Sequence, residues 1–143
     1  MAQSTINPAD FPFVFGDHLV VGYTKGTQIG IVYNQDAFTY SKGNDGEGAR
    51  VMSNDRSVII TLTLAMYSLS NKKLSDIHAE DLKTGNNTKD VSFKDLRGTT
   101  EGTGTGASLM KYADITVADT VTDRVWRIWV DDYKGIVGGG LAV

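Results

Sequence analysis

The sequence lacks cysteine and has only two prolines among its 143 residues. Without cysteine the chain forms no disulfide, uses no thiol nucleophile and holds no metal through thiolates. It also lacks a basic surplus, since 14 Lys and Arg stand against 17 Asp and Glu for a net charge of −3. Proteins that read nucleic acid carry a Lys/Arg excess, so this balance argues against that class.

Long hydrophobic runs are also missing. The longest apolar stretch, residues 58–67, is about half of the ~20 residues that a membrane helix needs, and Thr61 and Thr63 interrupt it. The N-terminus has no basic residue ahead of its apolar part, so we expect no secretory signal. We therefore expect no membrane partner.

Glycine is abundant, with 16 residues, and the apolar residues alternate with polar ones. In residues 58–66 every second side chain is apolar, which places Ile60, Leu62 and Leu64 on one face of a strand. Thr61 and Thr63 then lie on the opposite face. The pattern indicates strands that are joined by turns.

Period-two segments recur along the chain and predict strands at residues 18–23, 28–34, 37–42, 56–67, 90–96, 108–117 and 124–132. Residues 11–15 contain Pro12, so they are expected to form an edge strand or a docked arm. Residues 70–84 have Leu74, Ile77 and Leu82 at helical spacing, with Gly85 just past the end. The predicted fold is mainly β, a β-sandwich or barrel of about seven strands with one flanking α-helix.

Two glycine-rich segments, residues 43–48 and 98–106, are expected to be polar loops, the second a flexible hairpin tip. In the last predicted strand, Trp126 and Ile128 share the core with Ile60, Leu62 and Leu64. Arg127, Trp129 and Asp131 then point away from that core.

The chain contains no recognisable active site. His18 and His78 are the only histidines and are expected to be polar surface residues, since no second imidazole lies at ligand spacing. Asp45 and Glu47 lie in a turn-rich segment, GNDGEG, that lacks the EF-hand spacing. We expect no catalytic residue, no cofactor and no metal.

One long run, FTYSKGNDGEGARVMSNDRSVIITLTLAMYSLSNKKLS, resembles the signature of bacteriophage tail tube proteins of the contractile-tailed branch. Its parts are a strand, a turn at residues 43–47, the motif NDRS at residues 54–57, a long strand and a helix that opens with serines. VSFKDLRGTT at residues 91–100 and the tryptophan-bearing strand with its VGGG ending agree with the same family. The resemblance covers residues 16–140, leaving residues 1–15 as an N-terminal arm before one tail-tube domain, residues 16–143.

The resemblance implies a virion structural protein with a β-sandwich-like barrel, similar to the tubes of type VI secretion systems. Its subunits form hexameric rings that stack into the inner tail tube, through which double-stranded DNA passes on ejection. The implied partners are further copies, the tail sheath, the baseplate and the tail terminator, in a virion made in the bacterial cytoplasm. The candidate bore-lining residues are Thr61, Thr63, Arg127 and Asp131, and the candidate contacts between subunits are Asp45, Glu47, Asn54, Arg56, Thr103 and Thr105.

A bore lined by threonine would be hydrated and would hold DNA only weakly, whereas a basic wall would grip phosphates. A second class of function stays open, a small β-sandwich binding module for a carbohydrate or a protein. An enzyme is the third alternative.

Overall fold

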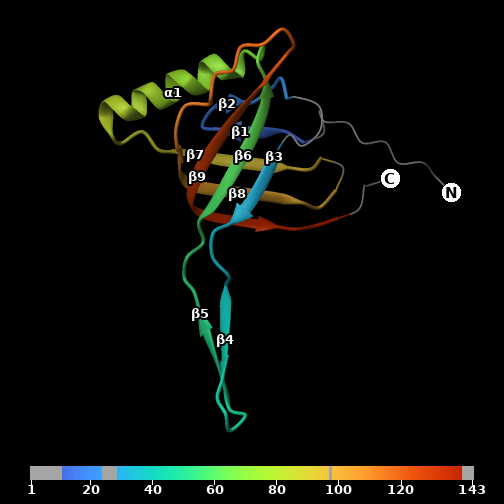
Figure 1. The fold of residues 1–143 in the computed structure, drawn as a ribbon, viewed down its shortest axis with the longest axis vertical. Coiled ribbons are helices and arrows are strands. Elements are labelled where there is room, and N and C mark those ends of the chain that lie inside the picture. Colours follow the sequence, from blue (N-terminus) through green and yellow to red (C-terminus); the bar gives the residue numbers. More distant parts are fainter. Residues whose placement is uncertain (1–10, 24–28, 97, 140–143) are drawn as a thin grey trace, which may run out of the picture.

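The structure is a computed structural model that describes residues 11–23, 29–96 and 98–139. In this part of the chain the elements are β1 (Phe13–Phe15), β2 (His18–Leu19), β3 (Ile29–Tyr33), β4 (Phe38–Lys42), β5 (Gly48–Met52), β6 (Val58–Ala65), α1 (Ser70–Thr84), β7 (Lys89–Lys94), β8 (Glu101–Leu109) and β9 (Asp123–Ile136). Seven strands form one curled sheet in the order β2-β1-β7-β8-β9-β6-β3. The predicted mainly β fold with a single flanking helix is confirmed, with the sheet curled into a half-barrel (Figure 1).

The core lies on the inner face of this sheet. Strand β6 pairs with β3 on one side and with β9 on the other, in a register that sets Ile60 opposite Ile128 and Leu62 opposite Trp126. These four side chains and Leu64 are buried. Strand β6, which carries this alternation, therefore lies inside the sheet, where both neighbouring strands form hydrogen bonds with its backbone.

The helix begins and ends close to the predicted positions. Gly85 ends α1 in the left-handed conformation, with φ of 69°, and its N–H reaches the carbonyl of Asp81. Ser70, Leu74 and His78 are buried, but Leu82 is exposed, so the helix packs closely from its start to His78 and not in its last turn. No helix in the described ranges is long and apolar enough to cross a membrane.

The prediction of a flexible loop at residues 98–106 is wrong from residue 101 onward, because β8 is an internal strand between β7 and β9. Its glycines are required by the packing of the inner face. A Cβ at Gly102 would collide with the Tyr133 ring, and one at Gly104 would collide with Val130. Gly106 has φ of 67° beside the register shift in the β7–β8 ladder, a conformation that glycine adopts without strain.

The strand predicted at residues 108–117 is also wrong beyond residue 109, where β8 ends. Residues 110–122 connect β8 to β9 without strand pairing. Ile115 and Val117 favour a strand by composition, but each is about four-fifths exposed. Propensity without a neighbouring strand does not make a sheet.

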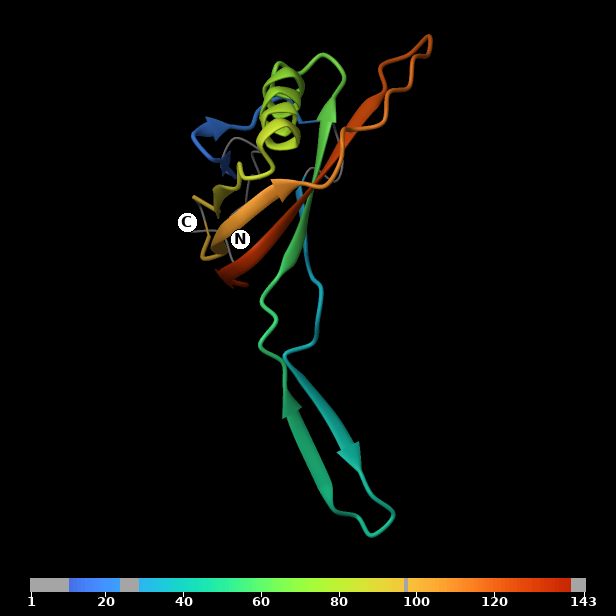
Figure 2. The same cartoon turned by 90° about the vertical axis from the view of Figure 1, so that its left-hand side faces the viewer.

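The sequence did not predict β5, which pairs with β4 in a two-stranded hairpin set apart from the main sheet. We call this hairpin, residues 38–52, the arm. Figures 1 and 2 show it extending from the body along the long axis of the molecule. None of its residues is buried.

Residues 13–15 of the predicted N-terminal arm form β1, which lies between β2 and β7. Phe13 and Phe15 are fully buried in the core, so this segment is neither an edge strand nor a loosely docked arm. Residues 1–10 of that predicted arm lie outside the described residues.

Candidate assembly surfaces

The described residues contain no group of three or more His, Cys, Asp or Glu that could hold a metal ion. The expectation that both histidines are surface residues is wrong for His78, which is buried with its ring edge-on to Tyr112 at 4.5 Å. His18 is half-buried, and its Nε2 lies 3.0 Å from the Ser70 hydroxyl. Burial lowers the pKa of His18, with a further lowering from Lys73, so its neutral form is favoured. Each histidine thus has a packing role.

The sheet face opposite the core, which we call the open face, carries most of the predicted bore-lining residues. Thr61 pairs with Arg127 across β6 and β9, and Thr63 lies one step along β6 on the same side. Asp131 is exposed, farther along β9 beside Gly106. The structure thus brings three of the four residues together and sets Asp131 apart.

The open face is more apolar than the sequence analysis expected. Ile59 lies across from Trp129, which is 38% exposed, and Val32 continues the same row on β3. Polar and charged side chains flank this row, among them Thr61 and Arg127. A mixed surface of this kind, without a surplus of one charge, offers no strong electrostatic grip on DNA.

A hydrogen-bond network ties the root of the arm to the body. Asp55 accepts bonds from the Ser57 hydroxyl at 2.6 Å and from its N–H at 2.9 Å, and these bonds hold the pKa of Asp55 below its usual range. Asn34 donates to the same hydroxyl at 2.9 Å. Arg56 donates from its guanidinium to the Ser53 carbonyl at 2.8 Å.

The body also holds the root from the other side, because the N–H of Tyr133 donates to the Arg56 carbonyl at 3.1 Å. Arg56 was predicted to contact another subunit, but in this chain it fixes where the arm leaves the sheet. Asn54 lies exposed in the same root. The root therefore gives the arm a defined direction.

The arm ends in a tight glycine-rich turn with acidic side chains. The Gly43 N–H donates to the Glu47 carbonyl at 2.7 Å, and the Glu47 N–H donates to Asp45 Oδ1 at 3.1 Å. Gly46 has φ of 87°, which the turn requires. Asp45 and Glu47 are both exposed at the tip. Both side chains are therefore accessible for the predicted contact with another subunit.

The strands of the arm carry large apolar side chains that no other described residue covers. Tyr40 is 74% exposed, and Val51 and Met52 are more than half exposed. The guanidinium of Arg50 stacks over the ring of Phe38 at 4.3 Å, one of few side-chain contacts within the arm. An isolated two-stranded hairpin is at best marginally stable in water. The exposed apolar side chains of the arm therefore favour its burial against another surface.

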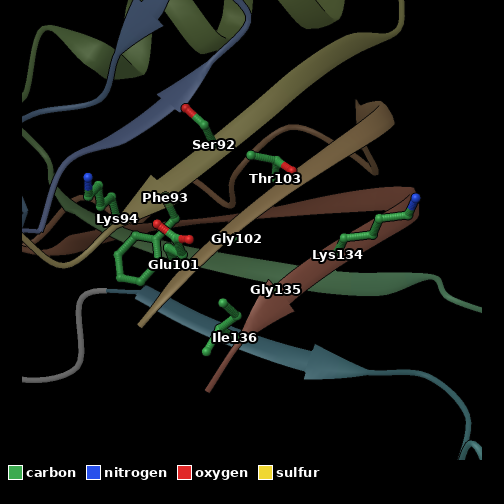
Figure 3. A pocket seen from close by; sticks show the side chains of 9 residues that line it. All are labelled: Ser92, Phe93, Lys94, Glu101, Gly102, Thr103, Lys134, Gly135 and Ile136. Carbon is green, nitrogen blue, oxygen red and sulfur yellow. The ribbon is translucent and has the colours of Figure 1, made fainter. Parts of the chain in front are cut away.

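A hollow of about 510 Å³ lies where one end of each of the adjacent strands β7, β8 and β9 comes together (Figure 3). Lys94 and Lys134 stand on opposite sides of it, and Thr103 lies between them on β8. Its remaining lining is Ser92, Phe93, Glu101, Gly102, Gly135 and Ile136. Of the two β8 threonines predicted to make contacts, Thr103 lines this hollow, and Thr105 pairs with Asp132 next to it.

The apolar side chains of the arm and Lys134 of the hollow were not predicted from the sequence. The exposure of Tyr40 and Met52 could not be predicted from the sequence, because it depends on the arm extending away from the body. The available signal was the paired runs on both sides of residues 43–47, each of five residues, which predict a hairpin when they are read together.

The sequence matches no protein-family model and no curated protein. The fold is similar to that of subunits from contractile injection particles. A chain of the anti-feeding prophage cap, the AFP tube terminating cap, superposes with a TM-score of 0.60 at 11% identity, over 95% of this chain and 93% of that chain.

Chains from an extracellular contractile injection system, PVC, are similar to the same degree. One comes from the sheath/tube terminator in the extended state, with a TM-score of 0.59 at 11% identity over 96% of this chain and 100% of that chain. Another comes from the sheath-tube complex in the extended state, with a TM-score of 0.60 at 12% identity over 92% and 91%. At these identities the likeness concerns the fold, which spans nearly the whole of each chain.

Proposed function

We propose that this chain is a structural subunit of a contractile tail or contractile injection particle, with no catalytic activity. The support is the fold, which is shared over almost the full length with cap, terminator and sheath–tube chains of such particles. The surfaces agree with a structural role, because the conspicuous features are an uncovered arm, an open sheet face and a hollow. In this proposal the chain functions within an assembled particle, either a phage virion or a related particle.

Within that class we propose the tube subunit, which forms hexameric rings that stack around a bore. The arm is the observation that carries this proposal. Tyr40, Val51 and Met52 are exposed among the residues that the structure describes, and the root of the arm is held in one direction by Asp55 and Ser57. Because the arm points along the long axis of the molecule, a copy displaced along that axis is the partner that it reaches (Figure 2).

Ring closure follows from the sheet. The main sheet ends at β2 on one side and at β3 on the other, so it has two edges in a single chain. An uncovered edge presents unpaired N–H and C=O groups, and head-to-tail contact between copies around a ring removes such edges. The open face with Thr61, Thr63 and Arg127 then lines the bore through which DNA passes. The sheath, baseplate and terminator are the proposed partners outside and at the ends.

A tube terminator is a second candidate, and the likeness to a tube terminating cap and to a sheath/tube terminator favours it. The two candidates differ in what the purified chain does. A tube subunit adds rings without limit, because each ring presents the surface that its own arms bind. A terminator forms a single ring that caps a tube of another protein and does not add a second copy of itself.

Negative-stain electron microscopy of the purified chain separates these outcomes. Tubes that lengthen with protein concentration support the tube subunit, and single rings support the terminator. A variant with residues 38–52 replaced by a short Gly-Ser turn is the test of the arm, because the body keeps its core and should form rings but no tubes. Monomers at all concentrations, joined to binding of a carbohydrate on a glycan array, would favour the binding module instead.

A further inference from the structure

The hollow at β7, β8 and β9 has the chemistry of a site for an acidic, hydroxyl-bonding peptide segment. Lys94 lies across from Glu101 in the β7–β8 ladder, so these two charges offset each other. Lys134 lies across from Thr103 and faces the hollow from the other side (Figure 3). Ser92 and Thr103 add hydroxyl groups between the lysines. The net charge of this lining is positive although the whole chain is negative.

The arm tip has the complementary chemistry. Residues 43–48 contain two carboxylates and no basic residue. Asp45 closes the turn by accepting the Glu47 N–H, which leaves the Glu47 side chain as the carboxylate that extends from an ordered backbone. With three glycines among its six residues, the tip is narrow enough to enter a hollow of about 510 Å³.

We infer that the hollow receives the acidic arm tip of a second copy of this chain, with Glu47 pairing with Lys134 of the receiving copy. The inference rests on the proposed function, because it names the surface that the arm reaches in a stacked assembly. The arm does not reach its own hollow, since its tip lies far along the long axis from β7, β8 and β9 (Figures 1 and 2). The contact joins two different surfaces, so it does not close on itself and repeats from ring to ring.

The shape of the sheet supports this assignment. Strands β7 and β8 and the last part of β9 run across the long axis, whereas β3 and β6 run roughly along it (Figure 1). The hollow lies over β7, β8 and the end of β9, and its lining includes neither Thr61 nor Thr63. An arm tip seated in the hollow leaves those threonines uncovered, so both assignments can hold in one tube.

Site-directed cross-linking tests the contact directly, and the absence of native cysteine makes the test clean. Protein carrying Asn44→Cys at the tip is mixed with protein carrying Thr103→Cys in the hollow, assembled, and treated with a short bismaleimide. The matched control replaces Thr103→Cys by Glu80→Cys on the exposed surface of α1. Dimers that form with Thr103→Cys and not with Glu80→Cys support the inference. Equal yields, or no dimers in assembled tubes, overturn it.

A charge exchange is the second test of this contact. Glu47→Lys and Lys134→Glu should each raise the protein concentration needed for assembly by about fivefold, as the loss and reversal of one exposed ion pair predicts. The double variant should return toward the wild-type value, and the single defects should shrink with added salt. Glu80→Lys, which makes the same charge change on α1, should assemble normally.

The wild-type protein distinguishes the failure of this inference from that of the proposed function. If wild-type tubes form but the charge exchange changes nothing, the tip binds elsewhere and the tube proposal stands. If the wild-type chain forms no stacked assembly, both proposals fail together.

Discussion

Replacing Gly104 with alanine should destabilise the fold although it adds one methyl group to a strand. The added Cβ would collide with Cγ1 of Val130 and lie 3.0 Å from Cγ2 of Val91, and both valines are buried. Overpacking of this kind costs about 1–3 kcal/mol in a close-packed core. For a domain near this size each kcal/mol lowers the melting temperature by roughly 2–4 °C, which differential scanning calorimetry measures.

The matched control is Gly30→Ala on β3, where a Cβ would meet nothing within 4 Å. That change should alter stability by less than about 1 kcal/mol, or slightly raise it, because alanine restricts the unfolded chain. Val130→Ala removes the atom that clashes, so the double variant Gly104→Ala with Val130→Ala should cost less than the sum of the two single changes. A Gly104→Ala protein as stable as the wild type would refute the assignment of β8 glycines to packing.

Three further outcomes follow from the same structure. Trp126→Ala should cost about 3–5 kcal/mol in chemical denaturation and lose folding before assembly, because the indole is buried; a folded but unassembled variant would contradict this. Replacing Thr61 and Thr63 by lysine should leave rings intact but slow DNA ejection, with relief at high salt, and normal ejection at low salt would remove both residues from the bore. The lowered pKa of Asp55 implies that its bonds to Ser57 stabilise the arm root above about pH 4 and are lost as the pH falls through that lowered pKa, seen as a smaller protection factor of the Ser57 amide, relative to the intrinsic exchange rate at each pH.

Local patterns with one clear period predicted their elements well. Residues 58–64 alternate strictly because both faces of β6 have fixed environments, a dry core on one side and a half-exposed surface on the other. The helix was predicted from Leu74 and from Gly85, whose left-handed conformation ends it. In both places the local preference and the tertiary packing favour the same structure.

The errors arose where distant residues decide the local structure. Residues 101–106 look like a loop because five of the six are glycine or threonine, but the inner face there is filled by Tyr133 and Val130 from β9. Ile115 and Val117 look like a strand, yet no neighbouring strand pairs with them in the described structure. Neither the partner strand nor its side-chain volume can be read from the local sequence.

The candidate surfaces were predicted only in part, for a similar reason. The position of Thr61 and Thr63 follows from alternation alone. The hollow beside Lys134 combines residues from three strands, and the arm is recognisable only once its direction relative to the body is known. The residue types of each surface could be predicted from the sequence. Which surfaces share one side of the molecule could not.

The most direct test of the central claim is a cryo-electron microscopy reconstruction of assemblies formed by the purified wild-type chain. We expect stacked rings in which the arm, residues 38–52, lies against the body of a copy in the next ring. Thr61 and Thr63 should face the bore. Rings or tubes whose arms extend into solvent without touching another copy would contradict it, and so would a protein that stays monomeric at every concentration.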